Sequence, residues 1–190
     1  MKIYFSLVNL QYKKTVISIR FIVGLLILFS FYSNELMGLR EMSVYFNESI
    51  PFYHIAFTLS DNDFLMIYFV SLYLIYSNIP YRDEQQMQIL TRTGKKVWLF
   101  SYLGVILLIS ITFIFFLFLF TILFLNTQLN FTNKWGRIIG TLGQQPHFGI
   151  PFNIEYDYSY YVQIHLAPFE AFIRTIFFSF AIQCIFGLCM

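Results

Sequence analysis

Glu170 and Arg174 are the two residues of this sequence whose types and spacing come closest to chemistry. They lie four positions apart in an otherwise apolar run, so one face of a helix carries both charges. A charge within a membrane-spanning helix is costly and usually faces protein or water. The spacing therefore predicts an intramembrane ion pair, and the alternative is that the two residues line a substrate path.

Residues for catalysis or metal binding are not evident elsewhere in the sequence. The segment "TGKKV" at 93–97 has a glycine–lysine pair but lacks the upstream glycine and the following hydroxyl of a phosphate-binding loop. Cys184 and Cys189 have neither metal-ligand spacing nor the pattern of a disulfide framework. The histidines are scattered, at His54, His147 and His165. We predict no catalytic residue, no metal and no cofactor in this chain.

The composition is that of an integral membrane protein. Of the 190 residues, 58% are hydrophobic and 12% are charged, whereas a soluble domain has about 25% charged residues. The lipid bilayer is therefore an expected partner. The net charge of +2 gives no reason to expect nucleic acid as another.

Four apolar runs predict four transmembrane helices in a single transmembrane domain, 1–190. A helix needs about 20 apolar residues to cross a bilayer, and inside lipid its backbone groups must be satisfied within the segment. No small-residue cleavage site follows the first run, so we favour an uncleaved span over a signal peptide. The fold class is an all-α integral membrane protein with spans at about 15–33, 60–79, 98–125 and 168–190.

The basic residues predict the orientation of these spans. Eight lie in the N-terminal segment and in loop 80–97, against three in loops 33–63 and 126–167. The positive-inside rule then places the N-terminus and loop 80–97 in the cytoplasm, and the other two loops outside. We expect a multi-pass protein of the cell membrane.

The stretch "PYRDEQQMQILTRTGKKVW", 80–98, is the most polar part of the chain. Asp83 and Glu84 can cap the start of a short helix, and Met87 and Leu90 can share one of its faces. Gly94 is a natural helix stop. We predict a cytoplasmic helix of about two turns, whose shape suits a groove on another protein; a plain polar loop is the alternative.

Three residues at the end of this stretch are predicted to anchor it at the membrane interface. Lys95 and Lys96 can reach the lipid headgroups, and Trp98 can mark the start of the third span.

The same stretch resembles the loop between the second and third spans of ABC-2 type permeases, the membrane subunits of a class of ABC transporters. The resemblance is carried by Glu84, Arg92, Gly94, Lys95, Lys96 and Trp98. "NKWGRIIGTLG" in the second outer loop is also similar to a pattern of Gram-positive members. The resemblance covers roughly 13–190 and implies six spans, of which four are visible here.

The resemblance also implies partners and roles. The short helix would be a coupling helix that docks on a separate ATP-binding cassette subunit, beside a second permease copy or relative. The coupling residues would be Asp83, Glu84, Met87, Leu90 and Arg92. This chain departs from the family in its long outer loop and in lacking a fifth and sixth span, and we expect it to be a piece of a longer protein.

The loop 126–167 is too long for an unstructured connection, which favours a fold or a function. The alternation of Ile154, Tyr156, Tyr158 and Tyr160 has period two and predicts a strand or an extended segment. The loop is either an aromatic belt on the outer leaflet or an extracellular cap that contacts substrate.

Our leading hypothesis is the membrane-spanning permease subunit of an ATP-driven, ABC-type exporter, with ATP hydrolysis in a separate chain. The alternative is a non-transport membrane protein, such as an immunity or sensor-like component that acts through its outer loops. An intramembrane enzyme is the third possibility, and no nucleophile with a base is visible for it.

Overall fold

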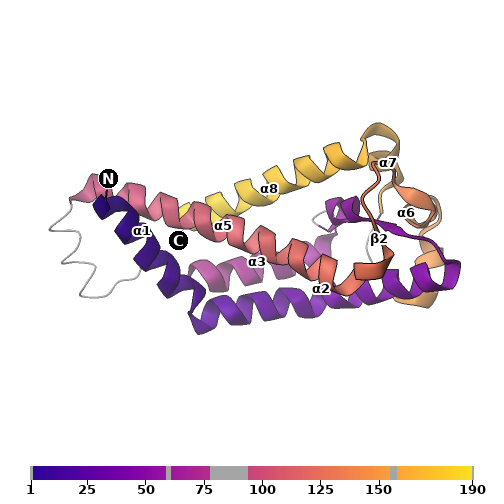
Figure 1. Ribbon diagram of the computed structural model, residues 1–190, viewed down its shortest axis with the longest axis horizontal. Helices are drawn as coiled ribbons and strands as arrows, with labels where there is room; N and C mark the ends of the chain where they lie inside the picture. The colour runs from indigo at the N-terminus through magenta and orange to yellow at the C-terminus, as the bar shows by residue number, and fades with distance from the viewer. Residues whose placement is uncertain (1, 59–60, 78–93, 155–157, 190) are drawn as a thin grey trace.

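A computed structural model of the chain describes residues 2–58, 61–77, 94–154 and 158–189. Its long helices run along one axis, and short helices and loops gather at one end (Figure 1). Three helices are long and apolar enough to cross a membrane: α2 (Ile19–Phe46), α5 (Lys95–Leu125) and α8 (Pro168–Cys189). The apolar helix α3 (Asn62–Tyr76) has 15 residues, about 22 Å in length, which is short of the roughly 30 Å of a bilayer core.

The helices around the first expected span, 15–33, have other bounds than that span. Two helices cover this region, α1 (Lys2–Val16) and α2. Ser18 lies directly before α2 and caps it, because its Oγ accepts a hydrogen bond from the Phe21 N–H at 3.2 Å. The helix then continues well beyond position 33, and it stops at Asn47, which has a left-handed φ of 51°.

Residues 33–46 are therefore helix rather than the start of an outer loop. Leu36, Leu39 and Met42 recur on one face of this part of α2, and all three are buried. Their spacing matches the period of a helix, so the packing of this face holds the helix together beyond the last continuous apolar run.

Helix α5 is at the centre of the bundle, since α1, α2 and α8 all pack on it. Phe29 of α2 stacks on Phe120 with ring centroids 4.1 Å apart. Gly187 allows α8 to come close to α5, because a Cβ at this position would lie 2.9 Å from the Ile106 side chain. A larger residue at 187 would separate these two helices.

The short elements at one end form a compact unit, which we call the cap (47–58, 126–154 and 158–166). They are β1 (Ile50–Pro51), η1 (Phe52–Phe57), η2 (Asn126–Gln128), β2 (Leu129–Asn130), α6 (Gly136–Gln144), η3 (Pro146–Phe152) and α7 (Tyr160–His165). Strands β1 and β2 pair in parallel, with Ile50 opposite Leu129. The apolar face of α6 is buried at Ile138, Ile139 and Leu142.

The structure describes only part of the segment that was expected to be a strand or extended, and Ile154 and Tyr158 lie outside any helix or strand. Ile154 and Tyr158 are both buried, whereas Tyr156 lies outside the described residues. Tyr160 begins helix α7 instead of continuing an extended segment. The period-two pattern was therefore wrong at its C-terminal end, because a helical turn starts there.

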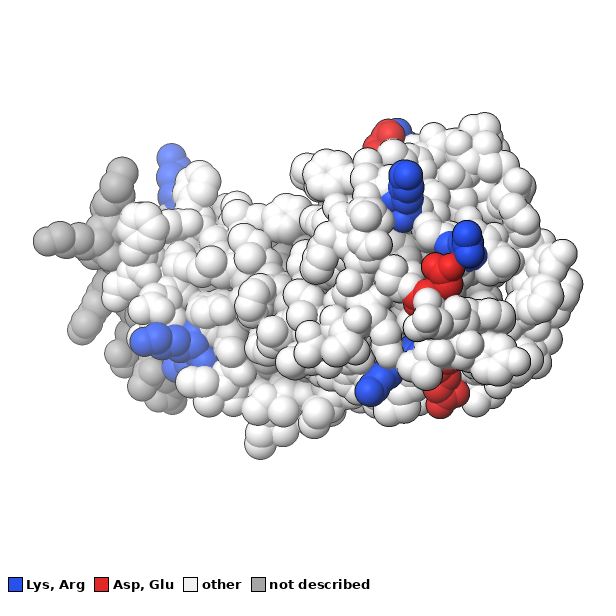
Figure 2. Space-filling model, turned by 45° about the vertical axis from the view of Figure 1, so that its right-hand side comes forward, with Lys and Arg blue, Asp and Glu red and all other residues white. Residues whose placement is uncertain are grey.

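The charged side chains fall into two groups along the long axis. Figure 2 shows basic residues at one end of the face in view and residues of both signs in the half that holds the cap, with an uncharged band between them. Among the described residues, the acidic ones lie in the second half of α2 and in the cap. The others lie in the first turns of α3 and α8 and directly before α3.

Candidate functional site

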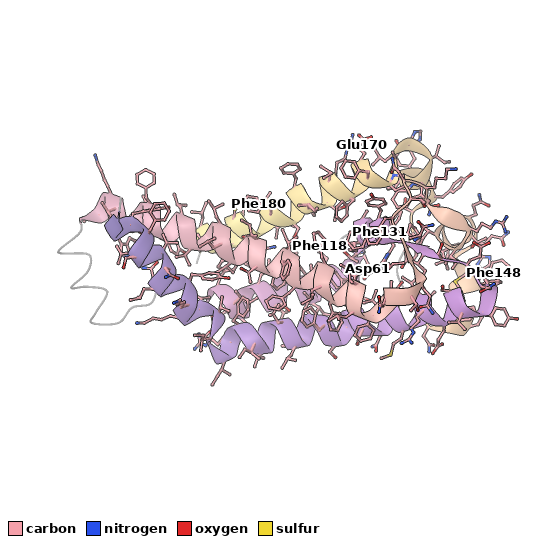
Figure 3. The ribbon with its side chains drawn as sticks, viewed as in Figure 1. Asp61, Phe118, Phe131, Phe148, Glu170 and Phe180 are labelled. Atoms are coloured by element: carbon pink, nitrogen blue, oxygen red, sulfur yellow. The ribbon has the colours of Figure 1, made fainter. Side chains whose placement is uncertain are left out.

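Glu170 and Arg174 lie in contact near the start of α8, at the end of this helix that adjoins the cap (Figure 3). Arg174 Nη2 is 2.5 Å from Glu170 Oε1. The side chain of Glu170 is 50% exposed and that of Arg174 is 64% exposed, so the protein does not bury the pair. The contact expected from the i, i+4 spacing is therefore formed at the surface of the protein.

The predicted coupling residues lie outside the described residues: Asp83, Glu84, Met87, Leu90 and Arg92. The structure does describe both flanks of this segment. Helix α3 ends at Tyr76, and Gly94, with a φ of 81°, stands immediately before α5. Glycine adopts this positive φ without strain, whereas other residues would be strained.

The predicted interface anchors occupy the first turn of α5. Lys95 and Lys96 are exposed, and the half-buried Trp98 stacks on Tyr102 with ring centroids 5.9 Å apart. Two lysines at a helix N-terminus are unfavourable with respect to the helix dipole. An external partner for their charges, such as lipid headgroups, would offset this cost.

Tyrosines connect α5 to three other helices through contacts that the sequence did not reveal. The pairs are Tyr12–Thr112 at 2.7 Å, Tyr32–Thr121 at 2.9 Å and Tyr76–Ser110 at 3.2 Å. Each of the three α5 hydroxyls also donates to the carbonyl four residues earlier in its own helix. The tyrosines must therefore be the donors of the interhelical hydrogen bonds.

A second polar group lies between α3 and α8. The hydroxyls of Tyr68 and Ser179 are 2.5 Å apart, and Gln183 Nε2 donates to the Tyr68 oxygen at 2.9 Å. Gln183 Oε1 and Ser71 Oγ are buried without a hydrogen-bond partner in the part of the chain that the structure describes. The only signal in the sequence was the i, i+4 spacing of Ser179 and Gln183 on one helical face.

A cavity of about 770 Å³ lies between α2, the N-terminal half of α3 and η3 of the cap. Its polar lining includes the four carboxylates of Glu35, Glu41, Asp61 and Asp63. Its apolar lining includes Phe31, Met37 and Met66, whose side chains are exposed. The sequence did not indicate this site, because residues 33–63 were predicted to form a single outer loop.

Two of the four carboxylates stabilise the surrounding structure through hydrogen bonds. Asp61 caps α3, since its Oδ1 accepts from the Phe64 N–H at 2.8 Å. Glu35 is 3% exposed and accepts a hydrogen bond from Tyr158 at 2.6 Å. Across the described ranges, no group of three or more His, Cys, Asp or Glu side chains could hold a metal ion. The cavity is suited to cationic or hydrogen-bond-donating groups.

His54 is the one buried histidine among those described. Its Nδ1–H donates to the Pro51 carbonyl at 2.9 Å, while Nε2 is buried without a partner in the described part of the chain. Burial lowers the pKa of His54 to about 4, and the hydrogen bond to Pro51 opposes this shift. The ring is therefore neutral near pH 7, and its role is to pack η1 within the cap.

The fold and these sites define a helical protein with three helices that are long and apolar enough to cross a membrane. Comparison with family models, curated proteins and solved structures finds no match for this chain.

Proposed function

We propose that this chain is a membrane-spanning permease subunit of an ATP-driven, ABC-type exporter. The observation that carries the proposal is the residue order of Tyr81–Trp98, which resembles the coupling loop of ABC-2 permeases and precedes the long apolar helix α5. ATP hydrolysis belongs to a separate ATP-binding cassette subunit in this proposal. A second permease copy or relative completes the complex.

The central position of α5 supports a mechanical role for the loop. A displacement before Lys95 acts directly on α5, on which α1, α2 and α8 pack. The helices are also joined by directional tyrosine–hydroxyl hydrogen bonds, such as Tyr32–Thr121. Such contacts favour movement between discrete arrangements over continuous deformation. Movement of the helix predicted at Asp83–Leu90 would in this way change access between the helices.

The proposed orientation has the N-terminus and residues 80–97 in the cytoplasm of a multi-pass cell-membrane protein. The charge distribution supports it. Lys13, Lys14, Lys95 and Lys96 belong to α1 and to the start of α5, whereas the described acidic residues gather near the cap. An excess of Lys and Arg on one side is the pattern that orients membrane proteins with that side inward.

A non-transport role through the outer surface is the second candidate, and the cap is the observation that favours it. Its buried face at Ile138, Ile139 and Leu142 and the adjoining cavity give that end of the molecule a defined shape. A protein that only recognises a ligand outside the cell would need the cap but no ATPase.

Met87→Asp and Leu90→Asp, tested separately, distinguish these two functions. An apolar anchor in a protein interface contributes about 1–2 kcal/mol or more, so each change should weaken association with the ATPase by about 5- to 30-fold. The readouts are co-purification of the ATPase and the ATP turnover of the purified complex. Lys95→Gln is the matched control, because its expected partner is the headgroup layer.

The expected result is loss of association and of complex-dependent turnover in both aspartate variants, with the control unchanged. Normal association and turnover in both would eliminate the coupling role and favour the cap-based function.

A further inference from the structure

Helix α7 presents two faces of different character. Gln163 belongs to the inner face, because its Nε2 donates to the Tyr158 carbonyl and to a carbonyl of α6, each at 2.9 Å. The outer face carries Tyr160, Tyr161 and Ile164, which are all exposed. Their spacings of three and four residues place them together on the helix. An exposed face of large apolar side chains marks an interaction surface.

Helix α5 fixes where the boundary of a bilayer would lie on the cap side. Lys95 and Lys96 are charged and exposed, so the hydrocarbon begins no earlier than Val97 along this helix. A helix rises the roughly 30 Å of a hydrocarbon core within about 20 residues. The boundary on the cap side therefore lies at the level of Leu117 or beyond. A tilt of α5 moves it further along the helix.

Helix α7 lies close to this boundary. Phe172 of α8 is at the level of Phe118 of α5, since their ring centroids are 5.3 Å apart. Pro168, the first residue of α8, is about 6 Å from Phe172 along the helix. The end of α7 at His165 is at most about 10 Å further. A boundary beyond Leu117 shortens this separation, so α7 lies in or directly above the headgroup layer.

The ion pair of α8 indicates the same level. Arg174 lies further into the apolar part of α8 than Phe172, and its guanidinium reaches back to Glu170 on the cap side. Arginine side chains near the edge of the hydrocarbon extend in this way toward the headgroups. Tyrosine, with an apolar ring and a polar hydroxyl, is enriched in the same layer. The outer face of α7 therefore has the composition of an interfacial anchor.

We propose that α7 binds the headgroup layer on the cap side of the membrane through Tyr160, Tyr161 and Ile164. Zwitterionic lipid suffices, because α7 contains no Asp, Glu, Lys or Arg. The hydrogen bond from Trp135 Nε1 to the Leu166 carbonyl, at 3.1 Å, joins the bound segment to the rest of the cap. The membrane would in this way hold the cap in place. The proposal does not depend on a transport function.

Tyr45 provides a matched control in the same end of the molecule. It is 75% exposed, against 71% for Tyr161, and it lies near the end of α2. Phe29 of α2 stacks on Phe120, and Tyr45 is about 24 Å further along the helix. Even a hydrocarbon boundary as far along α5 as Leu125 would leave Tyr45 about 16 Å outside it. This tyrosine therefore lies beyond the headgroup layer.

The experiment places a nitroxide label at Tyr161→Cys or at Tyr45→Cys, in the full chain without native cysteines. The protein is reconstituted in phosphatidylcholine nanodiscs with one chain in each. Power saturation of the electron spin resonance measures collisions of the label with O₂, which concentrates in lipid, and with a water-soluble nickel chelate. The label at 161 should show more O₂ collisions and severalfold fewer nickel collisions than the label at 45.

A second variant tests the side chains rather than the level alone. Tyr160→Ser/Ile164→Ser, at exposed positions of α7, should raise the nickel accessibility of the label at 161 toward that at 45. The unfolding temperature in detergent should stay unchanged, because neither side chain packs in the core.

Three results would overturn the proposal. Equal nickel accessibility at 161 and 45 would place α7 in water and leave its outer face for a soluble partner. Low accessibility of both reagents at 161 would show that this face is buried against protein. Unchanged nickel accessibility at 161 in the serine double variant would show that α7 is held at this level by α8 and does not itself bind the lipid.

Discussion

His54→Asn should remove a large part of the acid sensitivity of the folded state. His54 is 1% exposed, and its pKa in the folded protein is about 4, against about 6.5 in an unfolded chain. Asparagine keeps a donor toward the Pro51 carbonyl, but it does not titrate in this range. The comparison of the two proteins therefore isolates the proton of the imidazole.

The sign follows from where the proton binds. Between pH 6.5 and 4 the unfolded chain takes up a proton on His54 and the folded protein resists it, so acid favours unfolding. The contribution of His54 to stability is fully present above pH 6.5 and is lost as the pH falls toward 4. With these two pKa values, the wild type should lose about 2 kcal/mol by pH 5 and about 3 kcal/mol by pH 4, relative to the variant.

The assay is thermal unfolding in detergent, followed by tryptophan fluorescence at pH 7.5, 6, 5 and 4. The chain has two tryptophans, and Trp135 packs on Phe57 in the cap with ring centroids 4.9 Å apart. A Trp98→Phe background therefore leaves a single reporter close to His54. His165→Asn, at an exposed histidine of α7, is the control.

The expected result is that wild type and His54→Asn diverge steadily below pH 6.5, while the control follows the wild type. Parallel pH curves for wild type and His54→Asn down to pH 5 would refute the burial of this ring in the cap.

Three further predictions test the rest of the structure. Gly38→Ala should destabilise the cap by about 1–3 kcal/mol, because its Cβ would meet a backbone oxygen of η3 at 2.4 Å; Gly140→Ala, with nothing within 4 Å, should be neutral or stabilising when measured by the same unfolding assay. Tyr68→Phe should cost about 0.6–1.7 kcal/mol in detergent unfolding, and no cost would mean that its interhelical hydrogen bonds do not form. In a background without native cysteines, single cysteines at Gln144 and Gln86 should react with an impermeant reagent from outside and inside respectively, and outside labelling of both would reverse the proposed topology.

The long apolar runs predicted their helices well. The third and fourth expected spans, 98–125 and 168–190, correspond to α5 (Lys95–Leu125) and α8 (Pro168–Cys189). In a long and mostly apolar run, helix is the conformation that satisfies the backbone in lipid. The same criterion could not find α6, whose glycine-rich sequence indicates a loop, although Ile138, Ile139 and Leu142 give it a buried face.

Whether a candidate site could be predicted from the sequence depends on how far apart its residues lie along the chain. Glu170 and Arg174 were recognisable because their contact is local in sequence, at i, i+4. The contacts of Tyr32 with Thr121 and of Tyr68 with Ser179 join residues 89 and 111 positions apart. Hydroxyl residues in an apolar run carry no sign of which distant partner they meet, so these contacts follow only from the packing of the helices.

The length of α2 explains both why the helix continues beyond position 33 and where the acidic cavity lies. Its 28 residues extend about 42 Å at 1.5 Å per residue, whereas a bilayer core is about 30 Å thick. An α2 that crosses the bilayer therefore extends about 12 Å, or two helical turns, beyond the hydrocarbon core. After Arg20, its first charged residue is Glu35, and Arg40 and Glu41 follow. Glu35 and Glu41 line the cavity. Hydropathy falls where such a helix leaves lipid, but the helix itself ends only at Phe46, before the left-handed Asn47.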